Sequence, residues 1–290
     1  MVEALIINGL LFGGMYSLLA IGFSLVFGVA KILNLAHTAF YMIAAFLAYI
    51  ATMILGLPLL LSAILAIIVT SILAMVCYKL CFDRIKEHET AVIIVSVAIG
   101  ILIQEVLLLI FSGHFRRIPP FVSGFMEIVG IRVAYQNIFA IAASILTLSG
   151  VWFLLTKTKF GIALRAVAQD REIANLSGIN VSQICMITMG ISGILAGIAA
   201  VIIGSIFLVS PLMWLTPLII VLAAVVLGGL GSLKGSVFAA FILGFAEATV
   251  TCLIPGGSFL KGAISLSVMV GVLLIRPEGL FGVVFEEERL

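Results

Sequence analysis

The feature that most constrains the fold is a succession of long apolar segments separated by short polar breaks. A helix that crosses the hydrocarbon core of a bilayer needs about 20 predominantly apolar residues. The pattern therefore predicts an all-α integral membrane protein, a polytopic helical bundle of about 8–10 transmembrane segments in a single domain over residues 1–290. The segments lie near residues 5–29, 38–55, 58–78, 91–112, 134–155, 183–209, 214–230, 236–254 and 261–275. The segment that starts at Trp214 is short for a full crossing, and a half-helix or re-entrant piece is an alternative there.

Composition supports the membrane assignment. Hydrophobic residues make up 64% of the chain and charged residues 10%, against about 45–50% and about 25% in soluble domains. The net charge of +2 gives no reason to expect a nucleic acid partner. Glu3 is acidic where a signal peptide is basic, and the apolar stretch that follows is too long, so we expect a retained membrane helix.

The basic residues predict the orientation, because lysine and arginine favour the cytoplasmic side of a membrane. An odd number of spans with the N-terminus outside leaves only Arg116, Arg117, Arg132 and Lys261 on the outer side. The cytoplasmic group is then Lys31, Lys79, Arg84, Lys86, Lys157, Lys159, Arg165, Arg171, Lys234, Arg276 and Arg289. Residues 113–133, with Pro119 and Pro120, are predicted to form an outer loop that can include a short hairpin.

The cytoplasmic loop at 157–182 has the pattern of a small docking element. After Gly161, apolar residues recur at helical spacing among charged ones, which predicts an amphipathic helix. Gly178 is suited to end that helix, and Asn180 to cap the next one with Gln183 at its third position. The apolar positions of the predicted helix are Ile162, Leu164, Val167, Ile173 and Leu176.

No motif indicates catalysis, a metal or bound nucleotide. The glycine-rich stretch "GGLGSLKGS" at 228–236 lacks the Gly-Lys-Ser/Thr order of a phosphate-binding loop. The chain's histidines, His37, His88 and His114, are scattered over different loops, and no fourth ligand joins Cys77, Cys81 and His88. We therefore expect no enzyme, no resident cofactor or metal, and unpaired cysteines.

Several stretches resemble the Liv-type permeases of ABC importers for branched-chain amino acids. Glu172-Ile173-Ala174-Asn175-Leu176-Ser177-Gly178 is similar to the "EAA, three residues, G" coupling loop of ABC-importer permeases, with isoleucine in place of the middle alanine. The stretches "NGLLFGGMYSLLAIGFSLVFGVAKILNLAH" at 8–37, "VVLGGLGSLKGSVFAAFILGFAEA" at 225–248 and "IRPEGLFG" at 275–282 extend the likeness almost end to end. Thr38 departs from the pattern, since the family usually carries glycine after the histidine.

The resemblance implies a permease subunit of an ATP-driven importer for leucine, isoleucine and valine, in a prokaryotic cell membrane. Its partners would be a second related permease, two cytoplasmic ATPase subunits, an extracytoplasmic binding protein and membrane lipid. ATP would be bound by the separate ATPase. The residues expected to couple to that ATPase are Arg165, Asp170, Arg171, Glu172, Ala174 and Gly178; an ordinary charged cytoplasmic loop is the simpler interpretation.

Candidates for the substrate path or for a subunit contact are polar residues within apolar segments, which are costly and usually face a cavity or a partner. They are Asn34, His37, Glu105 and Glu247. Asn34 and His37 belong to "NLAHTAF" at 34–40, either a polar turn in which Asn34 caps the next helix or a break that dips into the membrane. The breaks at 28–38 and 228–236 hint at an internal repeat.

Other residues have packing or anchoring interpretations. The glycines of the first and sixth spans, including the Gly193 and Gly197 pair, favour close helix packing. Trp152 and Trp214 are predicted to lie at the membrane interface.

Two alternatives remain open from the sequence. A urea or amide permease of the same family shares much of the pattern, and one subunit does not identify the substrate. An ion-coupled secondary transporter would use intramembrane carboxylates such as Glu105 and Glu247, and would need no ATPase.

Overall fold

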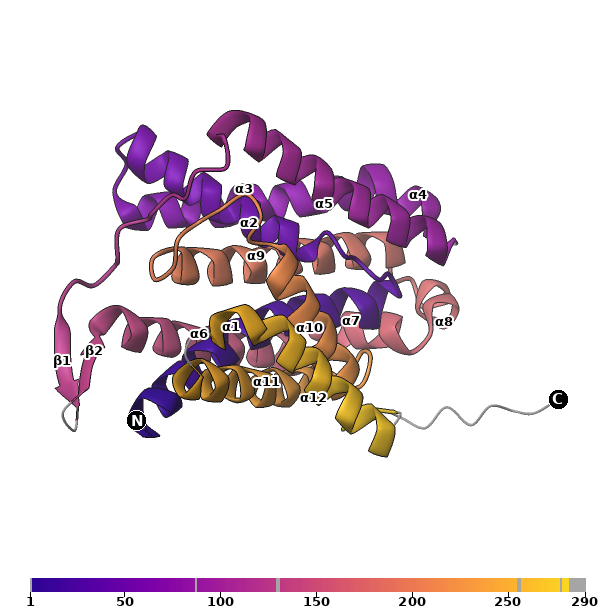
Figure 1. Cartoon of the computed structure of the whole chain (residues 1–290). Helices are drawn as coiled ribbons and strands as arrows, with labels where there is room; N and C mark the ends of the chain where they lie inside the picture. The colour runs from indigo at the N-terminus through magenta and orange to yellow at the C-terminus, as the bar shows by residue number, and fades with distance from the viewer. Residues whose placement is uncertain (1, 87, 129–130, 255–256, 277, 282–290) are drawn as a thin grey trace.

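The computed structural model describes the whole chain except residues 1, 87, 129–130, 255–256, 277 and 282–290. The chain is almost entirely helical (Figure 1). Its first half comprises α1 (Val2–Ala30), α2 (His37–Tyr49) with its π-helical extension η1 (Ile50–Ile54), α3 (Leu59–Cys77) with the extension η2 (Tyr78–Phe82), α4 (Asp83–Ile85), α5 (Glu89–Phe111), β1 (Phe125–Ile128) and β2 (Ile131–Ala134). Its second half comprises α6 (Tyr135–Lys157), α7 (Lys159–Gln169), α8 (Arg171–Leu176), α9 (Val181–Gly204), α10 (Leu215–Gly228), α11 (Leu233–Leu253), η3 (Gly257–Leu260) and α12 (Lys261–Ile275).

The helices confirm the predicted polytopic bundle. Among the described residues, seven helical segments are long and apolar enough to cross a membrane. The shorter apolar helices α10 and α12 have 14 and 15 residues, below the roughly 17 residues of a full crossing. Each predicted apolar segment overlaps one of these seven long segments or one of the two short helices. The helix after Trp214 is short, as expected.

The two ends of the bundle differ in charge. The β1–β2 hairpin pairs Phe125 with Ala134 and Glu127 with Arg132, and lies at the end that also holds the N-terminus (Figure 1). We call this the hairpin end, and the opposite one, with α4 and α8, the α8 end. The described basic residues of the predicted cytoplasmic group lie in segments at the α8 end, opposite the hairpin, so the predicted segregation of charge is confirmed. That the hairpin end faces outward stays a prediction.

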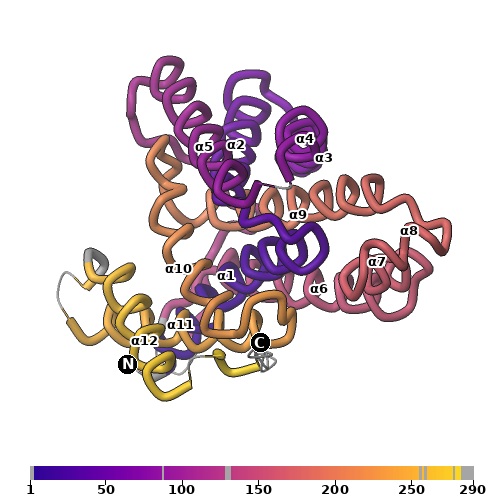
Figure 2. Tube along the Cα trace, turned by 90° about the vertical axis from the view of Figure 1, so that its right-hand side faces the viewer, coloured from indigo at the N-terminus to yellow at the C-terminus, as the bar shows by residue number. Residues whose placement is uncertain are grey.

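Helix α1 forms the centre of the bundle. In Figure 2 it is surrounded by α6, α9, α10 and α11. Glycines allow α1 and α11 to approach closely, because a Cβ atom on Gly244 would collide with the backbone of Gly13. Near the α8 end, the hydroxyls of Ser24 and Ser236 lie 2.5 Å apart across the same interface. Small residues thus set the distance between the two helices.

The predicted Gly193–Gly197 pair packs α9 against α3. A Cβ on Gly193 would lie 3.0 Å from the Cα of Ser71, and one on Gly197 would lie 3.1 Å from the Cα of Ile67. In a membrane, such close backbone contact supplies much of the attraction between helices. The packing role predicted for these glycines is therefore confirmed.

Two helices begin partway along the bundle rather than at one of its ends. After α1, residues 31–36 turn back, and α2 begins at His37, whose ring contacts Leu19 in the middle of α1. After α9, residues 205–214 leave the helix end and return, as Figure 1 shows, and α10 begins beside the middle of α5. The residues Asn34 and His37 of "NLAHTAF" are thus buried inside the bundle. That this stretch dips into the membrane and borders the substrate path stays a prediction.

The predicted match between the breaks at 28–38 and 228–236 is wrong. Residues 229–232 form a tight turn at the α8 end, with φ of +94° at Gly229 and +84° at Gly231. A Cβ on Gly28 would lie 3.6 Å from the carbonyl oxygen of Gly231, so this turn packs on the end of α1.

Candidate functional site: the α7–α8 segment and the buried polar groups

The predicted docking loop folds as two helices rather than one. The Thr158 hydroxyl caps α7 by accepting from Gly161 N–H at 3.1 Å. At Asp170 the backbone is extended, with φ −152° and ψ 118°, and its carboxylate accepts from the N–H groups of Glu172 and Ile173 at 2.8 and 2.9 Å. An aspartate that bonds to following amides starts a new helix. The helix therefore breaks at Asp170, which corrects the prediction of one continuous helix.

Gly178 ends α8 as predicted. Its φ is +82°, and the N–H groups of Gly178 and Ile179 donate to the carbonyls of Asn175 and Ala174 at 3.0 and 3.1 Å. This pair of bonds is a Schellman motif, which favours glycine at its left-handed position. Asn180 then caps α9 by accepting from Gln183 N–H at 3.0 Å. Both ends of α8 are thus fixed by local hydrogen bonds.

The apolar side chains of the segment do not share one face. Leu164 and Val167 are buried against the bundle. Ile162, Ile173 and Leu176 point to solvent with 60%, 62% and 88% of their surface exposed. The predicted single apolar face is wrong for these three. Ile162 lies on the exposed side of α7, and the break at Asp170 rotates α8 and leaves only Ala174 of that helix buried.

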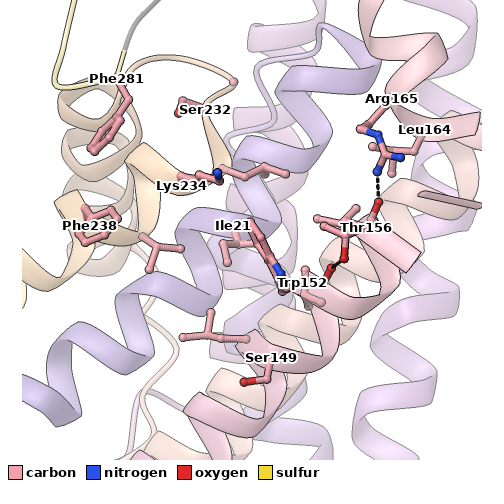
Figure 3. A pocket seen from close by; sticks show the side chains of 16 residues that line it. Ile21, Ser149, Trp152, Thr156, Leu164, Arg165, Ser232, Lys234, Phe238 and Phe281 are labelled. Atoms are coloured by element: carbon pink, nitrogen blue, oxygen red, sulfur yellow. Dashed lines mark hydrogen bonds between the residues drawn. The ribbon is translucent and has the colours of Figure 1, made fainter. Parts of the chain in front are cut away.

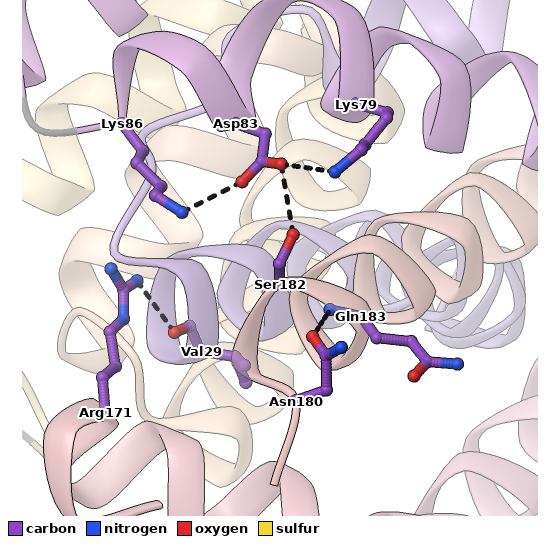
Figure 4. A network of polar contacts seen from close by, with 8 residues as sticks. All are labelled: Val29, Lys79, Asp83, Lys86, Arg171, Asn180, Ser182 and Gln183. Atoms are coloured by element: carbon purple, nitrogen blue, oxygen red, sulfur yellow. Dashed lines mark hydrogen bonds and ion pairs between the residues drawn. The ribbon is translucent and has the colours of Figure 1, made fainter. Parts of the chain in front are cut away.

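Two of the candidate coupling residues attach the segment to membrane helices. Arg165 donates to the carbonyl of Leu155 near the end of α6. Arg171 Nη2 donates to the carbonyl of Val29 at 3.0 Å, at the end of α1 (Figure 4). The last carbonyls of a helix have no partner within the helix and attract cations. Both arginines therefore bond to the ends of membrane helices. Three other candidates, Asp170, Glu172 and Gly178, are exposed and do not bond to another helix.

An ion cluster beside the segment was not predicted from the sequence. Asp83 accepts from Lys79 at 2.8 Å, from Lys86 at 3.0 Å and from the Ser182 hydroxyl at 3.1 Å (Figure 4). The spacing of Asp83 from the two lysines is a sequence signal for helical ion pairs. The bond to Ser182, which joins α4 to the first turn of α9, depends on the tertiary fold alone.

His37, the first residue of α2, contacts two other helices. Its Nε2 lies 3.0 Å from the carbonyl oxygen of Leu19, and its Nδ1 lies 2.9 Å from the hydroxyl of Ser192. Because a carbonyl only accepts, Nε2 carries the proton and Nδ1 accepts from Ser192. The Asn34 carboxamide oxygen accepts from Ala36 N–H at 3.1 Å, so it shapes the turn before α2 rather than capping that helix. Both side chains are buried.

Glu247 lies fully buried within α11. It accepts from the Tyr16 hydroxyl at 2.8 Å and from the Ser265 hydroxyl at 3.0 Å. These donors come from α1 and α12, so the carboxyl group joins three helices. A buried carboxyl in a membrane requires such partners, because an unpaired polar group there is costly.

Glu105 differs from Glu247 because it is exposed on the surface of α5. Its carboxylate accepts from the neighbouring Gln104 amide at 3.2 Å, while the Gln104 oxygen accepts from Trp214 Nε1 at 2.8 Å. Trp214 is 2% exposed and packs on Gly100 of α5, so its predicted place at the membrane interface is wrong. The buried indole anchors the start of α10, because its N–H donates to the half-buried amide of Gln104.

The described residues offer no metal site. Among them, no group of three or more His, Cys, Asp and Glu side chains is placed to hold an ion. The free cysteines are Cys77, Cys81, Cys185 and Cys252.

Comparison with known proteins identifies the family. Residues 5–275 match the model described as branched-chain amino acid transport system / permease component. The chain is 30% identical to the high-affinity branched-chain amino acid transport system permease protein BraD of Pseudomonas aeruginosa, over 96% of this chain and 94% of that protein. It is 27% identical to the probable branched-chain amino acid transport permease protein LivH of Methanocaldococcus jannaschii, over 97% of this chain and 93% of that protein.

A solved structure shares the fold of this chain. A chain of PsaBC from Streptococcus pneumoniae in complex with Fab superposes with a TM-score of 0.52 at 16% identity, over 94% of this chain and 92% of that chain. The relatives named by sequence are transport permeases rather than enzymes. With its multiple membrane helices and a family match over nearly its whole length, the chain is a multi-pass membrane protein that belongs to the permease components of branched-chain amino acid transport systems.

Proposed function

We propose that this chain is the transmembrane permease subunit of an ATP-driven importer for branched-chain amino acids, and that α8 docks onto a separate ATPase subunit. The observation that carries the proposal is the exposed surface of α8. Ile173 and Leu176 are 62% and 88% exposed beside the charged Glu172. A short helix held at both ends that presents apolar side chains to solvent is suited to insert into a groove of a partner.

The same segment has a direct mechanical connection to the membrane helices. Arg171 bonds to the end of α1, and Arg165 bonds to the end of α6. When the nucleotide state favours one arrangement of the ATPase, movement of α8 would displace α1. The start of α2 and helix α11 would follow, because His37 and Ser236 bond to α1. ATP itself stays on the partner, and this chain transmits the bias that the ATPase supplies to the helices that open or close the path.

The proposal includes a second, related permease packed against α5. Glu105 lies exposed within the apolar second half of this helix, where a carboxylate that faces lipid would be costly. A second permease would cover it, or a water-filled path between the two subunits would hydrate it. Glu105 is thus our candidate for the path or the subunit contact, whereas Asn34 shapes the turn before α2, and His37 and Glu247 join helices.

Exchange of a single charge on α8 tests the docking. We expect Glu172→Lys to abolish ATP-dependent uptake and co-purification of the ATPase, while the permease still inserts and folds. Glu89→Lys is the matched control, because Glu89 is an exposed glutamate at the same end of the bundle but on α5. Normal uptake by the Glu172→Lys complex would contradict the docking assignment.

The substrate and the energy source need a separate test. The full complex, assembled with its extracytoplasmic binding protein, should take up leucine, isoleucine and valine, as the names of the relatives indicate. Preference for urea or an amide would favour the related permeases. Uptake by the isolated chain that is driven by an ion gradient without an ATPase would establish a secondary transporter instead.

A further inference from the structure

A large apolar groove opens on the side of the bundle, near the α8 end. Its volume is about 1090 Å³, and it lies between α1, α6, α7 and α11 (Figure 3). Trp152 and Leu155 form one wall, Val237 and Phe238 form the opposite wall, and Ile21 forms the floor. The proposed function makes no use of this groove.

The groove opens toward the space that lipid occupies. Helix α6, which forms one wall, exposes large apolar side chains along its length, with Leu146 at 76% and Phe153 at 62%. Such a surface on a membrane helix faces hydrocarbon. The lining residues Trp152, Thr156 and Lys234 lie within the last turns of α6 or the first turn of α11, so the groove ends near the membrane surface.

Two cations stand at that end of the groove, and no carboxylate is among its described lining residues. Lys234 Nζ lies 5.2 Å from the centre of the Trp152 ring, and Figure 3 shows the Arg165 guanidinium beside Thr156. The described lining residues include neither Asp nor Glu, and within the described chain no ion pair involves Lys234. Arg165 uses Nη1 for the carbonyl of Leu155, which leaves Nη2 and Nε available to a ligand.

We propose that this groove binds an anionic phospholipid of the cytoplasmic leaflet. The acyl chains would lie between α6 and α11, and the phosphate would lie between Lys234 and Arg165. Basic pockets between membrane helices on the cytoplasmic side are suited to anionic head groups. The apolar walls match lipid chains, and the two unneutralised cations match the phosphate. The binding does not depend on which substrate the permease carries.

The chain's own tryptophans make the site measurable. Its two tryptophans are Trp152, which lines the groove and is 54% exposed, and Trp214, which is 2% exposed. Lipids with brominated acyl chains quench a tryptophan only on contact, so the signal lost in a Trp152→Phe variant reports the groove. The full-length chain is reconstituted in mixtures of phosphatidylglycerol and phosphatidylcholine, with bromine on one lipid and then on the other.

We expect Trp152 to be quenched more by brominated phosphatidylglycerol than by brominated phosphatidylcholine at equal mole fraction. Because one surface cation contributes about a fivefold preference for anionic lipid, Lys234→Gln should lower the selectivity about fivefold. Lys31→Gln is the control, since Lys31 is an exposed lysine at the same end outside the groove, and should leave the selectivity unchanged. Selectivity near one in the parent chain, or selectivity unaffected by Lys234→Gln, would overturn the proposal. Absence of quenching by either lipid would show that no acyl chain reaches Trp152 in the groove, and would also overturn the proposal.

Discussion

Removal of the His37 side chain is the sharpest test of how the start of α2 is held against α1 and α9. The ring is 1% exposed and bonds to the carbonyl of Leu19 and the hydroxyl of Ser192. His37→Ala removes both hydrogen bonds, worth about 1 kcal/mol each, and leaves a cavity that costs about 1–3 kcal/mol more. We therefore expect a loss of about 3–5 kcal/mol in the free energy of unfolding.

Gly22 provides an independent check on the position of the ring. A Cβ at Gly22 would lie 2.7 Å from Cε1 and 3.0 Å from Nε2 of His37, whereas its next neighbour is the Ser192 carbonyl oxygen at 3.4 Å. Gly22→Ala should therefore cost about 1–3 kcal/mol in the parent chain, as overpacking does. In the His37→Ala background the obstructing ring is absent, so the cost should nearly vanish. The two substitutions should then show a coupling energy of about 1–3 kcal/mol.

The assay is reversible unfolding of the purified chain in mixed detergent with increasing dodecyl sulfate. The four chains of the cycle are compared with Gly150→Ala, whose added Cβ meets no atom within 4 Å. Gly150→Ala should not lower stability in either background, because it only adds a better helix former. Equal costs of Gly22→Ala with and without His37 would refute the placement of the ring between α1 and α9.

Three further outcomes are expected. Tyr16→Phe should lower the free energy of unfolding by about 0.6–1.7 kcal/mol, the range for hydrogen bonds within membrane bundles, because Glu247 loses one donor; no change in the detergent titration would contradict the bond. Gly178→Val should strain the left-handed turn by about 1–2 kcal/mol and reduce ATP-dependent uptake, whereas Gly178→Asn, which tolerates that conformation, should retain most of it; equal uptake rates would count against the turn's role. Arg171→Met should leave insertion intact and reduce uptake per ATP hydrolysed in reconstituted vesicles, because α8 loses its bond to Val29; an unchanged ratio would exclude this route of coupling.

The comparison of sequence and structure shows which signals are local. The apolar segments predicted the helices, since the length of an apolar run is a property of the run itself. The caps at Gly178 and Asn180 were also predicted, because their partners lie within four residues. The break at Asp170 is local too, but the sequence pattern predicts one continuous helix there. Apolar residues keep helical spacing on both sides of the break, and this hides the capping signal of the aspartate.

The candidate residues were found by type, but their roles required the fold. Glu105 and Glu247 looked alike as acidic residues in apolar segments. The structure buries Glu247 between Tyr16 and Ser265 and leaves Glu105 on the surface of α5. That difference depends on which side of each helix faces its neighbours, and helices that are apolar all round carry little signal for it.

By itself, the sequence determined that this protein is a bundle of membrane helices with a capped polar segment at one end, because hydrophobic length and capping act over one segment at a time. Only the tertiary structure decided that α2 and α10 begin partway along the bundle rather than at its ends. It also decided that His37 meets Ser192 and that Arg171 meets Val29, pairs separated by 155 and 142 positions along the chain. Such contacts arise from the packing of whole helices through small residues, and no local pattern along the chain specifies which distant groups that packing brings together.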